Sequence, residues 1–131
     1  MKTSGVLNRQ LSQVIASMGH TDMLVVSDAG LPVPPDVPCI DLAVTAGVPT
    51  FLDVARAVAT ELEVERLIVS DELIQRDTRV PAALSAFFPR ARLDSVPHEQ
   101  FKALTARAHA VVRTGECTPY NNVILCSGVT F

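Results

Sequence analysis

Two short apolar runs, "MLVVS" at 23–27 and "RLIVS" at 66–70, constrain this chain more than any other feature. They lack the alternation of a strand with one exposed face, so they indicate strands that are covered on both faces. Apolar residues recur at helical spacing over 7–18, before the first run, and over 52–62, before the second. Strands interleaved with helices predict an α/β fold: a single domain over 1–131 with a largely parallel central sheet flanked by helices.

Capping and stop signals place further boundaries. Gly19 stands where a glycine would stop the first helix, and Thr50 with Asp53 resembles a capping box at the start of the second. Ser95 with Pro97 can start the last helix. The other expected elements are strands over 40–44, 91–93, 108–114 and 121–128, a short helix over 82–88, and an end of the second helix near 63. The segment 71–95 carries the weakest signals.

The chain has little charge with which to cover a surface. Only 19% of its residues are charged, against about 25% in an average domain, and 48% are hydrophobic. A compact α/β domain rich in Val and Ala would explain this, but we favour an oligomer whose subunits cover part of the surface. The C-terminus "GVTF" is apolar, so we expect Phe131 to be packed. A net charge of −3, with 11 scattered Lys and Arg, argues against nucleic acid as a partner.

Targeting and cysteine patterns bound the compartment. The N-terminus has no apolar core of signal-peptide length, and no window approaches about 18 uninterrupted apolar residues. We therefore expect a cytoplasmic protein with no membrane partner. Cys39, Cys117 and Cys126 are an odd number without CxxC spacing. They fit reduced thiols better than a disulfide framework or a zinc site, so we expect no metal.

The stretch "HTDMLVVSDAGLPVPP", residues 20–35, brackets a strand with two titratable side chains. Ligands of open α/β sheets collect beyond the carboxyl ends of strands. Asp28 lies at such an end, before a loop that prolines hold nearly fixed. Asp28 could instead cap a turn before Gly30. His20 follows a helix end, where the helix dipole stabilises an imidazolium, so it could be a capping residue or a proton-transfer group.

Polar side chains gather at two further places. His98 opens the segment "HEQFK", and Lys102 follows one turn later on the same helix face. The turn "GECTPYNN" suits sugar hydroxyls or could close onto itself. It presents Glu116, Tyr120, Asn121 and Asn122. Phosphate-loop, GxSxG and HExxH motifs are absent. The remaining groups suit acid–base chemistry without a cofactor on a small polar molecule, or simple binding of one.

Three segments together resemble a known family. They are "GVLNRQLSQVIASMGHTDMLVVSDAGLPVP" at 5–34, "HEQFK" at 98–102 and "GECTPYNNVILCSGVTF" at 115–131. They resemble the D-ribose pyranase family, which is related to the L-fucose mutarotases. The resemblance implies that the chain converts β-D-ribopyranose to β-D-ribofuranose without a cofactor. It also implies a homodecamer of two stacked pentameric rings.

The resemblance also implies roles for individual residues. His20 matches the family's proton donor. The positions that match its sugar-binding residues are Asp28, His98, Tyr120 and Asn122. Asn121 lies in the same segment, and Lys102 falls beside His98. The strand and the proline-rich loop would then place His20 and Asp28 in one pocket, built from one subunit or shared between two.

Several alternatives stay open at this point. The general base is unassigned among His98, Asp28 and a bound water. A mutarotase of fucose or another sugar would change the anomer and not the ring size. A non-catalytic sugar-binding accessory protein of ribose transport would bind the sugar without accelerating its interconversion. The His98 segment favours the ribose branch over the fucose branch.

Overall fold

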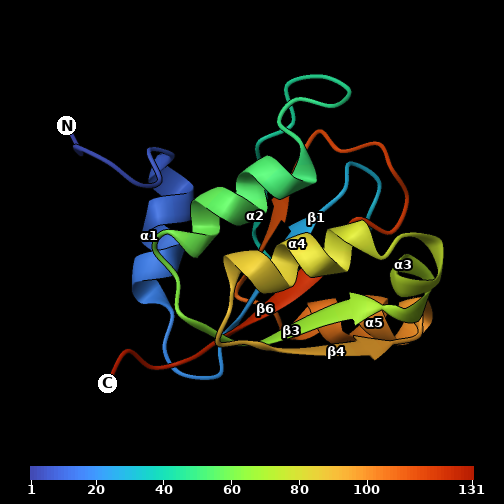
Figure 1. The fold of residues 1–131 in the computed structure, drawn as a ribbon. Coiled ribbons are helices and arrows are strands. Elements are labelled where there is room, and N and C mark those ends of the chain that lie inside the picture. The colour runs from blue at the N-terminus through green and yellow to red at the C-terminus, as the bar shows by residue number, and fades with distance from the viewer.

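Six strands and five helices follow one another in the computed structural model, which describes residues 1–131 (Figure 1). The strands are β1 (Met23–Ser27), β2 (Cys39–Asp41), β3 (Val64–Ser70), β4 (Arg92–Val96), β5 (Ala110–Arg113) and β6 (Val123–Ser127). The helices are α1 (Arg9–Ser17), α2 (Phe51–Ala59), α3 (Asp71–Arg76), α4 (Arg79–Phe87) and α5 (His98–Leu104), with a 3₁₀ turn at Thr105–Arg107. No helix is long and apolar enough to cross a bilayer.

All six strands form one sheet in the order β2-β5-β1-β6-β3-β4. The pairs β1–β5, β2–β5 and β3–β4 are parallel, which confirms the prediction of a largely parallel sheet. β6 alone runs antiparallel, against both β1 and β3. The amino end of β6 therefore lies at the edge where β1 and β3 have their carboxyl ends.

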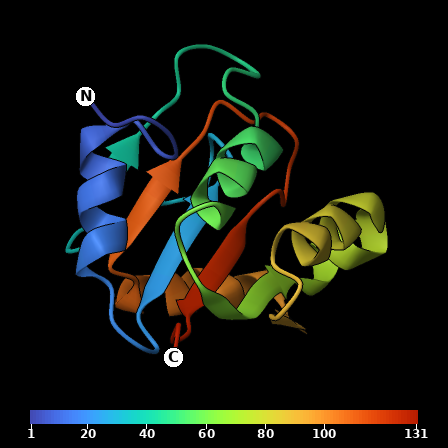
Figure 2. The same ribbon diagram turned by 60° about the vertical axis from the view of Figure 1, so that its left-hand side comes forward.

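Helices cover both faces of the sheet, as Figure 2 shows. α1, α2 and α4 pack on one face with Leu24 and Val26 of β1. Val25, between them, points to the other face and packs with Phe101 of α5. Successive side chains of a strand point to opposite faces, and all three β1 residues are fully buried. This burial on both faces explains why the run is apolar without alternation.

Several helix ends follow the capping signals. The Thr50 side chain accepts a hydrogen bond from the Asp53 main chain at 3.1 Å, as the capping box predicted. α5 begins at His98, directly after Pro97. α2 ends at Ala59 rather than near 63, because the chain turns there so that Leu62 can enter the core.

Other predictions need correction. The strand expected over 40–44 is only Cys39–Asp41, since its pairing with β5 ends at Asp41. α1 begins after Leu7, because Asn8 caps it; Leu7 is thus outside the helix and 72% exposed. Phe131, expected to be packed, is fully exposed in the single chain. α3 was not predicted at all, and the strand near 91–93 extends to Val96.

Candidate active site

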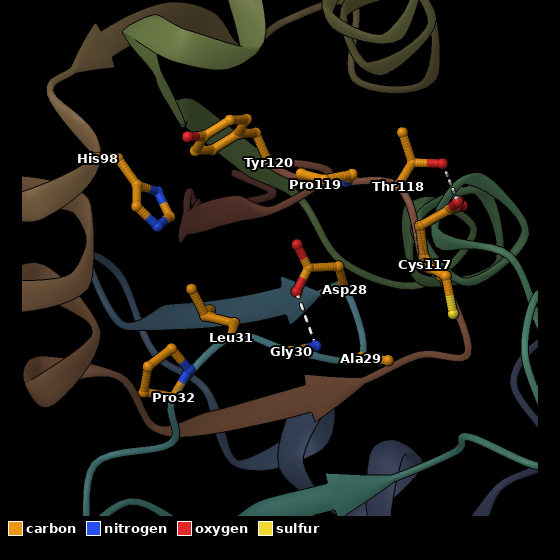
Figure 3. A pocket seen from close by; sticks show the side chains of 11 residues that line it. Asp28, Ala29, Gly30, Leu31, Pro32, His98, Cys117, Thr118, Pro119 and Tyr120 are labelled. Carbon is orange, nitrogen blue, oxygen red and sulfur yellow. Dashed lines mark hydrogen bonds between the residues drawn. The ribbon is translucent and has the colours of Figure 1, made fainter.

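One cavity of about 560 Å³ opens at the carboxyl edge of the sheet (Figure 3). Three connections meet there: the loop after β1, the start of α5 after β4, and the loop that leads into β6. The lining residues are Asp28, Ala29, Gly30, Leu31, Pro32, His98, Glu116, Cys117, Thr118, Pro119 and Tyr120. This volume falls within the range of small-molecule sites, about 300–1,000 Å³.

Asp28 is held from two sides at the end of β1. Its main-chain N–H donates to Oδ1 of Asn122 at 2.8 Å, and Nδ2 of Asn122 donates back to Oδ2 of Asp28 at 3.1 Å. Oδ1 of Asp28 accepts from the Gly30 N–H at 3.0 Å. The turn-capping interpretation of Asp28 is therefore correct, and the same carboxylate also lines the cavity. Each carboxylate oxygen has one fixed donor, which leaves lone pairs for a ligand hydroxyl.

His98 faces this carboxylate across the cavity (Figure 3). Its ring meets Tyr120 edge to face, with centroids 5.0 Å apart, and stacks on Phe101 at 6.2 Å. The ring nitrogen Nδ1 is buried and has no hydrogen-bond partner in the chain. Buried polar atoms of native proteins nearly always have a partner. The His98 ring lines the cavity, and no hydrogen bond within the chain holds it through Nδ1.

Tyr120 adopts a backbone conformation that non-glycine residues rarely take, with φ of 68°. Such strained residues cluster at functional sites, where the surroundings hold them in place. The Asn122 N–H donates to the Tyr120 carbonyl at 2.8 Å, which closes the turn into β6. The turn thereby points the phenol at the cavity and Asn122 at Asp28.

Glu116 lines the cavity but was not among the predicted site residues, although it belongs to the "GECTPYNN" turn. Its Oε1 accepts from the Phe51 N–H at 3.1 Å, and its Oε2 accepts from the Thr118 hydroxyl at 2.8 Å. Its carbonyl accepts from the Ala29 N–H at 2.8 Å. Glu116 thus joins the loop before β6 to the start of α2 and to the loop after β1.

Within one chain, His20 lies at the opposite edge of the sheet from Asp28, so one subunit alone does not build the predicted pocket with both side chains. His20 precedes β1, whereas Asp28 follows it. The five residues of β1 at about 3.4 Å each put about 17 Å between these edges. His20 pairs instead with Glu65 of β3, with 2.9 Å between Nε2 and Oε2 and both side chains half exposed. Within one chain, sequence proximity did not become spatial proximity.

Three other predicted residues, Lys102, Asn121 and Asn122, do not line the cavity. Lys102 is on α5 but pairs with Glu99 at 2.8 Å, and this hydrogen bond lowers the pKa of the Glu99 carboxyl. Asn121 is buried, and its side-chain oxygen accepts from Arg76. The structure thus brings together Asp28, His98 and Tyr120, with Asn122 behind Asp28.

The cavity is lined by two carboxylates, those of Asp28 and Glu116, together with an imidazole and a phenol. These groups can accept and donate hydrogen bonds to several hydroxyls at once, and an imidazole can move a proton near neutral pH. No group of three or more His, Cys, Asp or Glu side chains is arranged to hold a metal ion. The arrangement suits a polyhydroxylated ligand.

Comparisons with known proteins identify relatives over the whole chain. The model of the RbsD / FucU transport protein family matches residues 1–130. A curated D-ribose pyranase of Halalkalibacterium halodurans is 48% identical over 131 residues, and one of Paracidovorax citrulli is 51% identical over 131 residues. Both alignments cover 100% of this chain and of the relative.

Solved structures agree with this picture. Bacillus subtilis RbsD, in complex with D-ribose, matches with a TM-score of 0.95 and 44% identity, over 100% of both chains. The fucose mutarotase of Streptococcus pneumoniae, in complex with L-fucose, matches with a TM-score of 0.78 over 95% of both chains. At 20% identity this second match shows the fold alone.

Proposed function

This chain belongs to the RbsD / FucU transport protein family, and on that premise we propose that it is an isomerase that interconverts β-D-ribopyranose and β-D-ribofuranose. One observation carries the proposal: the full-length match to a D-ribose complex at a TM-score of 0.95 and 44% identity. The curated relatives named D-ribose pyranase point the same way. The cavity at the carboxyl edge, with Asp28, His98 and Tyr120, is the proposed ribose site.

The reaction requires two proton transfers in each half. Opening of the pyranose breaks the bond between C1 and the ring oxygen; that oxygen gains a proton, and the anomeric hydroxyl loses one to become the aldehyde. Closure adds the C4 hydroxyl to C1, with loss of its proton, while the aldehyde oxygen takes one up. No atom is gained or lost, so positioned acid–base groups suffice, and such groups contribute about 10²- to 10⁴-fold.

We assign the binding roles to the cavity residues. Asp28 accepts hydrogen bonds from sugar hydroxyls, and Asn122 keeps its carboxylate oriented. Tyr120 and His98, whose rings contact each other edge to face, bind the remaining hydroxyls. The candidates for the general base are still His98, Asp28 and a bound water, the three that the sequence analysis proposed.

His20 is the proposed acid, and its position at the far edge requires a second subunit. Within one chain, about 17 Å of β1 separates it from the cavity. His20 and its partner Glu65 are both half exposed, so they are accessible to another copy. We therefore propose that the active site is shared: His20 of one subunit reaches the sugar held by another.

The proposed assembly is a homodecamer of two pentameric rings. Support comes from large apolar side chains that the single chain leaves exposed: Leu7, Val44, Val48, Val129 and Phe131. Burial of such side chains between subunits would remove apolar surface from water. We also propose the cytoplasm as the compartment, because Cys39 and Cys117 are exposed free thiols, which persist where disulfides are disfavoured.

Saturation-transfer NMR on D-ribose tests the function directly. The protein should accelerate exchange between the pyranose and furanose signals, and His20→Ala should lose about 10²-fold or more of that acceleration. Acceleration that survives in His20→Ala would move the acid elsewhere, with His98 next. Ribose binding without any acceleration would indicate a sugar-binding accessory protein. Faster exchange between anomers only would indicate a mutarotase.

A further inference from the structure

The short helix α3 contacts both walls of the ribose cavity. Both carboxylate oxygens of Glu72 accept from the His98 main-chain N–H, at 3.2 and 3.1 Å. One turn later, Nη2 of Arg76 donates to Oδ1 of Asn121 at 2.6 Å. Residues four apart lie on the same face of a helix. One face of α3 therefore reaches the start of α5 and the turn into β6.

Each wall has a feature that its own local structure does not stabilise. α5 has Pro97 at its N-cap, so no side chain there accepts from the first N–H groups of the helix. The turn into β6 contains Tyr120 with φ of 68°, a conformation that its surroundings must maintain. Asn121, next to it, is 6% exposed and would be left with a buried unpaired oxygen without Arg76.

α3 itself is firmly attached to the sheet. It follows β3 directly, and Oγ of Ser70 caps it by accepting from the Leu73 N–H at 3.1 Å. Leu73 is fully buried in the core that α2 and α4 cover. Figure 1 shows α3 just past the carboxyl ends of β3 and β4. Its two polar side chains thus project from a fixed base.

We propose that Glu72 and Arg76 are positioning residues that set the separation of the two cavity walls. The inference rests on the proposed function, in which these walls hold the sugar. Neither residue lines the cavity; Glu72 acts through His98 and Arg76 acts through Asn121. The walls meet at the edge-to-face contact of His98 and Tyr120, so a shift of either wall changes the pocket that the sugar enters.

Steady-state exchange kinetics over a range of ribose concentrations test the proposal. Glu72→Ala and Arg76→Ala should each raise KM by about tenfold, the loss expected when a charge-assisted hydrogen bond no longer orders a binding group. The value of kcat should fall less than KM rises, since neither residue touches the reacting atoms. Gln75→Ala is the matched control, because Gln75 is exposed on the same helix. A KM within about threefold of wild type in both variants overturns the proposal.

Conservative variants separate positioning from folding. Glu72→Gln keeps one carbonyl oxygen as an acceptor, so its KM should return most of the way from the Glu72→Ala value to the wild-type value. A KM as high as that of Glu72→Ala contradicts the hydrogen bond as the cause. A double-mutant cycle with Asn121→Ala tests the other wall. If Arg76 acts through Asn121, then Arg76→Ala has no further effect in the Asn121→Ala background. Fully additive losses contradict that route. Arg76→Lys serves where Arg76→Ala fails to fold.

A readout without sugar distinguishes this inference from the proposed function. The NMR signal of the His98 imidazole should shift in Glu72→Ala, and the side-chain amide signals of Asn121 should shift in Arg76→Ala. Gln75→Ala should leave both in place. Should the wild-type protein fail to accelerate ribose exchange, the proposed function is refuted, and these signals still decide the positioning role. Unmoved signals in both alanine variants would refute that role even with an active enzyme.

Discussion

The distance of His20 from the cavity makes a sharp prediction for mixed assemblies. We consider two inactive variants, His20→Ala and His98→Ala. The first removes the proposed acid, and the second removes a cavity side chain. His98 is a suitable choice because its Nδ1 has no hydrogen-bond partner in the chain. Its truncation therefore breaks no protein hydrogen bond at that atom. Assembled separately, each variant should be inactive.

Assembled together, the two variants should regain activity. A shared site takes His20 from one subunit and His98 from another. With equal amounts and random assortment in a symmetric ring, about one quarter of the sites receive both native residues. Mixed assemblies should therefore show about one quarter of wild-type exchange per site. A site contained in one chain predicts no recovery, because every chain lacks one residue or the other.

The assay co-expresses the variants with two different affinity tags, selects assemblies that carry both, and measures ribose exchange by saturation transfer. A matched control mixes His20→Ala with the His20→Ala, His98→Ala double variant. That mixture contains no native His20 and should stay inactive. Assemblies that carry both tags yet show no activity above the separate variants would refute the shared site.

Three further predictions concern stability. Gly115→Ala should lower Tm, because a Cβ would overlap the Val48 carbonyl oxygen. The expected loss of unfolding free energy is about 1–3 kcal/mol or more. Phe101→Ala, at a fully buried position, should cost about 3–5 kcal/mol in urea unfolding. The hydrogen bond from Arg66 lowers the pKa of Asp94 below its ordinary value. The stabilisation that ionised Asp94 provides is therefore present above about pH 4 and is lost as the pH falls further. In Asp94→Asn, Tm should fall less steeply with decreasing pH in that acidic range.

Sequence patterns predicted the sheet because burial on both faces leaves a direct trace. The runs that became β1 and β3 are apolar without alternation, and runs this short fit strands better than helices. Asp28 was predictable for the same reason: the end of a buried strand is visible, and ligand sites lie there. Tyr120 and His98 were assigned to the site through the family resemblance, because their residue types alone left other roles open.

α3 was missed because it has only six residues, too few for a helical repeat of apolar residues to be recognised. A signal was present nonetheless. Ser70 followed by Asp71 and Glu72 is a capping residue with acidic side chains in the first turn, as helix starts require. Its two tertiary hydrogen bonds left no such trace, since they join residues 26 and 45 positions apart.

The direction of β6 explains why the cavity forms where it does and why one chain does not bring His20 to it. Because β6 runs against β1, the turn with Tyr120 reaches the carboxyl edge beside Asp28; a parallel β6 would have left it at the amino edge with His20. Only His20 stays at the amino edge. A shared site therefore requires the amino edge of one subunit to meet the carboxyl edge of the next. Such a contact joins two different surfaces, and repeated head-to-tail contacts of that kind form a ring where the rotation between subunits closes. The proposed pentameric ring and the proposed role of His20 thus depend on the same geometry.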